Sequence, residues 1–229
     1  MASNRWESMT MDERLLLAAD AAKKISYEQF LAWADEDLRP EWVDGEIITM
    51  SPASNRHQDL ARFLTALLSV FVETRSTGVI RPAPFQMRLE QGREPDLLFV
   101  ATPHLDRLKA AYLDGPADLV IEIITPERAS RDRGDKFYEY EAGGVNEYWL
   151  IDPLRERVEF YQLNDGRYQL AFSGAEGRYA SLVLPGFWLS IQWLWQETLP
   201  PVLDVLRELK VIWPNRSGSA IHKAPYSHA

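Results

Sequence analysis

Residues 118–125 read DLVIEIIT, a run of branched apolar residues that a single acid, Glu122, interrupts. Residues 94–100, EPDLLFV, form a second such run, with Asp96 near its start. Short apolar runs of this kind, bounded by Pro or Gly, are typical of buried strands. A carboxylate on a buried strand is costly without a partner, and two on neighbouring strands repel each other. A hard metal ion between them would remove both costs, so the pair indicates metal-assisted hydrolysis.

Around these two runs the periodicity predicts an α/β arrangement between residues 54 and 152. The expected order is a helix over 54–75, a hairpin of strands over 79–90 and 94–100 with its turn at 91–93, a short helix over 103–113, a strand over 118–125, a helix over 130–142 and a strand over 146–151. The strand–helix–strand part should be a right-handed parallel crossover, whereas the hairpin is antiparallel. We therefore expect a mixed β-sheet flanked by helices.

Shorter elements are expected on both sides of this unit. They are helices over 11–22, 26–35 and 201–210, β-hairpins over 40–50 and 157–172, and an apolar, Trp-rich stretch over 181–195. Ser26 and Gln29 form a capping box, and Asp44-Gly45 is a hairpin turn dipeptide. The predicted organisation is a helical extension over 1–24, the main domain with its β-hairpin extensions over 25–200, and a C-terminal helix with a flexible tail over 201–229.

Composition limits the class of protein. The 229 residues are 46% apolar and include no cysteine, which excludes disulfides, zinc–thiolate sites and cysteine nucleophiles. No apolar stretch reaches the roughly 18 residues that a membrane span needs, and the N-terminus has no signal-peptide core, so we expect a cytoplasmic protein without membrane contact. The net charge of −9 argues against a general nucleic-acid binder, although residues 1–53, with 5 Lys/Arg and 11 Asp/Glu, account for −6 of it.

The order of elements, with Pro95-Asp96 on one strand and Glu122 on the next, resembles the restriction-endonuclease-like superfamily and its PD…(D/E)xK signature. The further motifs are similar to one branch, the Uma-type family, a large bacterial group first defined as a domain of unknown function. These motifs are EWVDGE at 41–46, MSP at 50–52, His57, DLVIEIITP at 118–126, RDRGDK at 131–136 and GVNEYWLIDP at 144–153. The resemblance covers about residues 25–200 and implies a restriction-endonuclease-like core.

The resemblance also implies a set of site residues. Asp96 and Glu122 would hold Mg²⁺ or Mn²⁺, and the backbone carbonyl of Ile123 would add a ligand. The superfamily's lysine lies two residues after the acid, where this chain has Ile124, so Lys136 from the following helix is the matching candidate. A lysine among other cations and partly desolvated has a lowered pKa, which would suit a general base. Glu41 and His57 would complete the catalytic residues.

Each assignment has a plainer alternative. Asp96 after a proline can close a turn, and Glu122 can be neutralised by a buried salt bridge to Lys136. Lys136 can pair with Asp132 four residues earlier on a solvated helix face. His57 can be a surface or capping residue. Glu41 and Glu46 can both lie on a hairpin surface, and we favour a functional role for only one of them.

The predicted function is a metal-dependent endonuclease that hydrolyses DNA phosphodiester bonds. One alternative is a catalytically inactive binding or interaction module that kept the fold, which the acidic charge and the missing ExK lysine motivate. Another is a metal-dependent hydrolase of a different phosphoester. Superfamily nucleases that cut both strands commonly pair, so we expect a homodimer, with the Trp-rich stretch over 181–195 as core or as the candidate interface.

Overall fold

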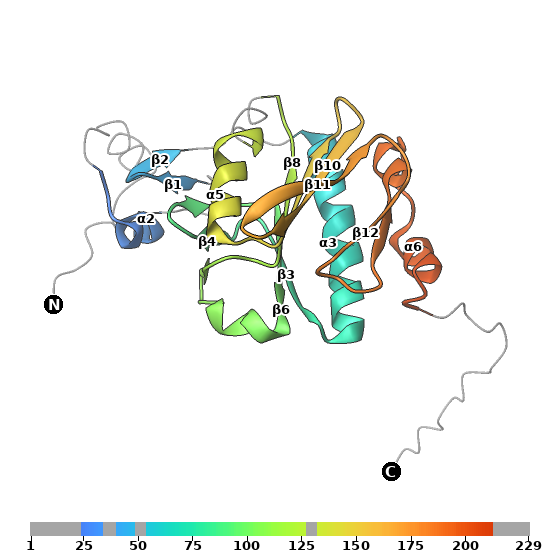
Figure 1. Cartoon of the computed structure of the whole chain (residues 1–229), viewed down its shortest axis with the longest axis horizontal. Coiled ribbons are helices and arrows are strands. Elements are labelled where there is room, and N and C mark those ends of the chain that lie inside the picture. The colour runs from blue at the N-terminus through green and yellow to red at the C-terminus, as the bar shows by residue number, and fades with distance from the viewer. Residues whose placement is uncertain (1–23, 34–39, 49–53, 127–131, 213–229) are drawn as a thin grey trace, which may run out of the picture.

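The computed structural model describes residues 24–33, 40–48, 54–126, 132–212 (Figure 1). The helix predicted over 11–22 and the tail beyond 214 lie outside the described residues. None of the described helices is long and apolar enough to cross a membrane.

A six-stranded mixed sheet forms the centre of the molecule, in the order β11-β10-β9-β8-β6-β3. Its strands are β3 (Gly78–Pro82), β6 (Leu97–Ala101), β8 (Leu119–Ile123), β9 (Glu147–Asp152), β10 (Arg157–Asn164) and β11 (Arg167–Gly174). Neighbours pair antiparallel except β8 and β9, which run parallel across the helix α5 (Asp135–Gly143). The predicted α/β class and the parallel crossover are confirmed.

Two helices cover opposite faces of this sheet (Figure 1). The long helix α3 (Asn55–Arg75) packs in one hydrophobic cluster with Leu97 and Phe99, while α5 contributes Tyr140 to a second cluster with Leu98 and Val100. Alternate residues of a strand point to opposite faces, so each buried strand must be apolar on both sides. Glu122 shares the α5 face with Val120, which places its carboxylate beneath that helix.

The antiparallel pairing predicted between segments 79–90 and 94–100 is present, but the prediction that a tight turn at 91–93 connects the two paired strands is wrong. β3 pairs with β6, but the chain then leaves this sheet, and β4 (Gln86–Arg88) pairs with β5 (Gly92–Arg93) in a second sheet. Pro82 and Pro84 end the first strand because a proline has no N–H for the ladder. This division places Arg93 in the second sheet, from which its side chain contacts Glu41 and Glu139.

The second sheet has the order β2-β1-β5-β4-β7 and gathers segments far apart in the sequence. Its remaining strands are β1 (Glu41–Val43), β2 (Glu46–Ile48) and β7 (Tyr112–Asp114). The helix predicted over 103–113 is instead the 3-10 helix η2 (Thr102–Arg107) followed by β7, whose partner β4 is distant in sequence. The Ser26–Gln29 capping box is confirmed, with both hydrogen bonds formed at the start of α2 (Tyr27–Trp33).

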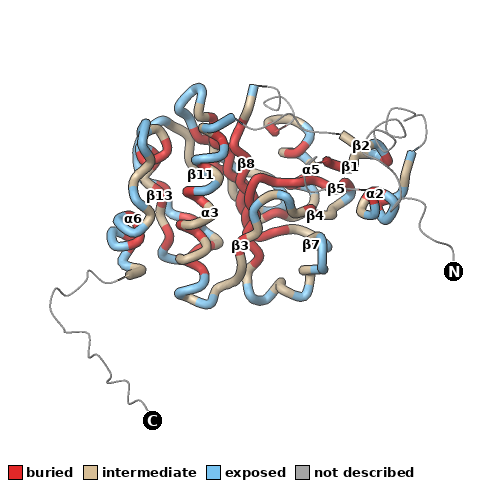
Figure 2. Tube along the Cα trace, turned by 180° about the vertical axis from the view of Figure 1, so that it is seen from behind, coloured by how far each residue is buried: buried red, intermediate tan, exposed pale blue. Residues whose placement is uncertain are grey.

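The C-terminal part closes the α3 face. It comprises β12 (Arg178–Ala180), β13 (Trp188–Ser190), the 3-10 helix η3 (Ile191–Trp195) and α6 (Val202–Glu208). Leu189, Trp193 and Leu206 join the same cluster as α3, and buried segments run through the middle of the molecule (Figure 2). The Trp-rich stretch is therefore largely core, and the homodimer stays a prediction.

Candidate active site

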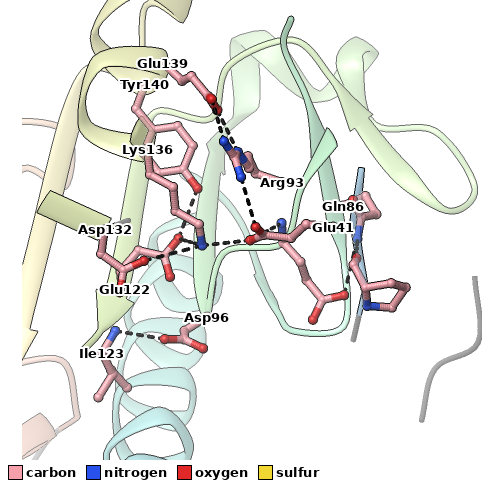
Figure 3. Close-up of polar contacts among 12 residues, drawn as sticks. Glu41, Gln86, Arg93, Asp96, Glu122, Ile123, Asp132, Lys136, Glu139 and Tyr140 are labelled. Atoms are coloured by element: carbon pink, nitrogen blue, oxygen red, sulfur yellow. Dashed lines mark hydrogen bonds and ion pairs between the residues drawn. The ribbon is translucent and has the colours of Figure 1, made fainter. Parts of the chain in front are cut away.

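Glu122 lies at the centre of a buried polar cluster between β8 and α5 (Figure 3). Its Oε1 is 2.8 Å from Lys136 Nζ and accepts a hydrogen bond of 3.0 Å from the Tyr140 hydroxyl. Lys136 and Tyr140 are four residues apart on α5, so they present their side chains from the same helix face. The alternative of a buried salt bridge between Glu122 and Lys136 is thus present, and the Tyr140 hydroxyl is a second donor to the same carboxylate.

Lys136 is held by carboxylates from three segments. Its Nζ is 2.8 Å from Glu41 Oε1, 2.8 Å from Glu122 Oε1 and 3.7 Å from Asp132 Oδ1. The pairing with Asp132 exists, but both side chains are buried rather than on a solvated face. Burial alone would lower the pKa of Lys136, whereas Glu122 and Glu41 raise it well above its usual value. The expected lowered pKa is therefore wrong, because anions and not cations surround the ammonium group.

Asp96 connects the start of β6 to the end of β8. Its Oδ2 accepts a hydrogen bond of 2.8 Å from the backbone N–H of Ile123 and lies 3.0 Å from His57 Nε2. Asp96 is therefore tied to the residue that follows Glu122. His57 belongs to the first turn of α3 and is only 3% exposed, and the cap of that helix is Ser54, whose hydroxyl accepts from His57 N–H. His57 is thus neither a surface residue nor the cap.

Glu41 reaches the cluster from β1 and is fully buried, while Glu46 of the same hairpin is exposed. Arg93 fixes Glu41: its Nη1 donates to Glu41 Oε2 at 3.1 Å, and its Nε donates to Glu139 Oε2 at 2.7 Å. The backbone N–H of Glu94 also donates to Glu41 Oε1, at 3.4 Å. Glu41 is therefore held in place from the second sheet and pointed at Lys136.

The five side chains singled out in the sequence, from Glu41, His57, Asp96, Glu122 and Lys136, are all buried here and linked in two connected groups. Tyr140, Arg93 and Glu139 are partners that the sequence reading did not identify. The i,i+4 spacing from Lys136 was a signal for Tyr140. Arg93 offered no such signal, because its partners lie 46 and 52 residues away.

Several carboxyl groups are buried close together in this cluster. Among the described residues, Glu41, Glu122 and Asp132 all lie within 3.7 Å of Lys136 Nζ. Burial raises the pKa of Glu122 to about 8; the nearby Lys136 lowers it, but Asp132 and Asp96 add to the rise. Burial and the neighbouring acids thus make the charged form of Glu122 costly, and a bound cation would reduce that cost.

The oxygen atoms present fit a hard divalent cation. Glu122 Oε2 is buried and has no hydrogen-bond partner among the described residues, which is costly for a carboxylate oxygen. No cage of three His, Asp or Glu ligands exists within the described part of the chain. Mg²⁺ rarely needs such a cage, since it commonly binds one or two carboxylates and keeps several waters.

A cavity of about 320 Å³ is lined by residues that neighbour site residues in the sequence. Its lining comes from the start of α3 and from the segments that follow β8 and β9, namely Ser54, Arg56, Ile124, Thr125, Pro126, Pro153 and Leu154. These residues adjoin His57 and Ile123, the two groups that contact Asp96. The cavity therefore offers space for a ligand at the end of the sheet where the acids lie.

Residues 27–192 match the family model described as "Uma2: Putative restriction endonuclease". This chain belongs to the Uma2 family. The match spans the central sheet, both covering helices and every residue of the buried cluster. The resemblance that the motifs predicted is thereby confirmed.

Relatives of this Uma2 chain carry little description of their own. The "Uncharacterized protein slr1290" of Synechocystis sp. is 24% identical over 147 residues, covering 62% of this chain and 76% of the relative. The "Uncharacterized protein sll1609" of the same organism is 30% identical over 131 residues, covering 54% and 72% respectively. The names of these two relatives state no activity, so the function of this chain has to be inferred from its site.

A solved structure has the same fold. It is the crystal structure of a "putative nuclease belonging to DUF820" from Anabaena variabilis, with a TM-score of 0.64 and 18% sequence identity. The match covers 74% of this chain and 97% of the other. The restriction-endonuclease-like core predicted from the motif order is consistent with this neighbour.

Proposed function

We propose that this protein is a metal-dependent endonuclease that hydrolyses phosphodiester bonds of DNA. The observation that carries the proposal is the connection of the two motif acids at one end of the sheet. Asp96 is hydrogen-bonded to Ile123, the residue after Glu122, and Glu122 keeps one buried oxygen without a hydrogen-bond partner among the described residues. Family membership supports the nuclease class, and the choice of DNA rests on the family's description.

In this proposal Asp96, Glu122 and the Ile123 carbonyl hold Mg²⁺ or Mn²⁺. The bound ion would neutralise charge on the phosphate and lower the pKa of a water nucleophile. Lys136, whose raised pKa keeps it protonated, would act as a fixed positive charge that stabilises the developing negative charge on the phosphate rather than as a base. Glu41 would hold Lys136 in place, and His57 would orient the Asp96 carboxylate.

Cleavage of supercoiled plasmid and of single-stranded DNA tests the proposal, with Mg²⁺, Mn²⁺ or EDTA in parallel. We expect metal-dependent cutting that Asp96→Asn and Glu122→Gln lose by at least about a hundredfold, since each removes one carboxylate charge from the site. Glu46→Gln is the matched control because Glu46 is exposed on the neighbouring hairpin, and it should cut like the wild type.

Other outcomes would lead to other conclusions. Equal cutting by wild type and both acid variants would identify a contaminating nuclease. Hydrolysis of a small phosphodiester without cutting of polymers would point to a hydrolase of another phosphoester. If the protein neither cuts DNA nor binds Mn²⁺, the proposal is contradicted and an inactive binding module is favoured.

A further inference from the structure

The two oxygens of the Glu122 carboxylate have different surroundings. Oε1 receives both the Lys136 ammonium at 2.8 Å and the Tyr140 hydroxyl at 3.0 Å. Oε2 is equally buried but has no hydrogen-bond partner among the described residues. Both partners therefore bind one oxygen, and the carboxylate leaves the other oxygen available to a further ligand (Figure 3).

Of the two partners, Tyr140 is the one with a fixed position. Its ring is fully buried and packs edge-on against Tyr148, with ring centroids 5.1 Å apart. Lys136, in contrast, divides its ammonium between Glu122, Glu41 and Asp132. A phenol held by packing fixes the direction of the bond it donates, so Tyr140 restricts rotation of the Glu122 carboxylate.

We propose that Tyr140 is a positioning residue for the metal site, whose hydroxyl engages Oε1 so that Glu122 offers Oε2 as its single metal-binding oxygen. This inference rests on the proposed function, because it assumes that Glu122 is a metal ligand. Groups that orient ligands in this way commonly change metal affinity 10- to 100-fold when removed. Tyr140 thus acts through Glu122 and has no contact with the substrate in this scheme.

The test is Mn²⁺ binding by calorimetry to wild type, Tyr140→Phe and Tyr168→Phe. The first variant removes only the hydroxyl and leaves the ring, so Oε1 still has Lys136. The second is the matched control: the Tyr168 hydroxyl also donates one bond of 3.0 Å, but to the Val145 carbonyl outside the site. We expect about tenfold weaker Mn²⁺ binding for Tyr140→Phe and unchanged binding for Tyr168→Phe.

A second readout separates positioning from a purely structural role. In cleavage, Tyr140→Phe should need about tenfold more Mn²⁺ for half-maximal rate, while the rate at saturating Mn²⁺ stays within about twofold of the wild type. Thermal unfolding without metal checks that the variants are folded.

Equal Mn²⁺ affinity of wild type and Tyr140→Phe would overturn the inference and leave the proposed function intact. Equal weakening in both tyrosine variants would overturn it too, because the cause would then be packing of the aromatic cluster. Absence of Mn²⁺ binding by the wild type would instead refute the proposed metal site, and the inference with it.

Discussion

Arg93 shows how a single buried cation can support several acids. Its side chain is 2% exposed and donates to Glu41 and to both oxygens of Glu139. In Arg93→Met, the fully buried Glu41 loses one of its cationic partners, and Glu139 loses both of its bonds from the guanidinium. Removing one partner of a buried ion pair typically costs about 3–5 kcal/mol, so we expect urea unfolding to report a loss of that size.

The matched control is Arg62→Met. Arg62 pairs with Asp59 on an exposed surface of α3, and such pairs contribute about 0–1 kcal/mol. The double variant Arg93→Met/Glu41→Gln should lose less than the sum of the two single variants, since both single variants break the same Arg93–Glu41 ion pair. A loss below about 1 kcal/mol in Arg93→Met would mean that Glu41 is held adequately without it.

At the scale of elements, one carboxylate joins α5 to the β10–β11 hairpin. Glu141 accepts from the backbone N–H of Tyr168 at 2.6 Å and from Arg167 Nη1 at 2.8 Å. The bond from Tyr168, followed by that from Arg167, lowers the pKa of Glu141 below its ordinary value of 4.5. Since the unfolded chain takes up the proton first, this stabilisation is complete above about pH 4.5 and is lost as pH falls through the folded-state pKa.

Glu141→Gln should therefore destabilise the protein at pH 7 more than at pH 3. We expect a difference from wild type of about 1–2 kcal/mol at pH 7, because hydrogen bonds to a charged group are lost, and a smaller one at pH 3. Urea unfolding at both pH values measures it, with the exposed Glu176→Gln as control. If the difference in unfolding free energy between wild type and Glu141→Gln is the same at both pH values, the charge of Glu141 contributes nothing to stability.

The elements differ in how far the sequence predicts them. Helix α3 follows from its helical apolar spacing, and strands β6, β8 and β9 follow from continuous apolar runs that are buried on both faces. Strands β4, β5 and β7 do not, because each is two or three residues long and depends on distant partners, such as Trp42 opposite Gly92 and Gln86 opposite Tyr112. Periodicity over two or three residues cannot be distinguished from a loop.

For the whole molecule, the same limit decides what was predictable about the site. Asp96 and Glu122 were identifiable because a charge in an apolar strand is unusual at the level of sequence. Of the carboxylates around Lys136, Glu122 and Asp132 were foreseeable as ion-pair partners, but the contact with Glu41 was not, because Glu41 arrives from the second sheet, whose pairing has no local signal. The pKa of Lys136 is raised first by Glu122 and then by Glu41, so the general-base expectation is corrected once the fold brings these carboxylates to the ammonium group.

The stability of the whole molecule should depend on the proposed metal, because ions that bind only the folded state stabilise it. At a Mn²⁺ concentration 100-fold above the dissociation constant, the gain is about 2.7 kcal/mol. For a chain of this size that corresponds to a rise in Tm of roughly 5–10 °C, which EDTA should reverse. Glu122→Gln should show a much smaller rise, since it removes a carboxylate from the site, while Glu46→Gln should behave as wild type. A rise of equal size in Glu122→Gln would place the stabilising ion elsewhere on the protein and contradict the assignment of Glu122 as its ligand.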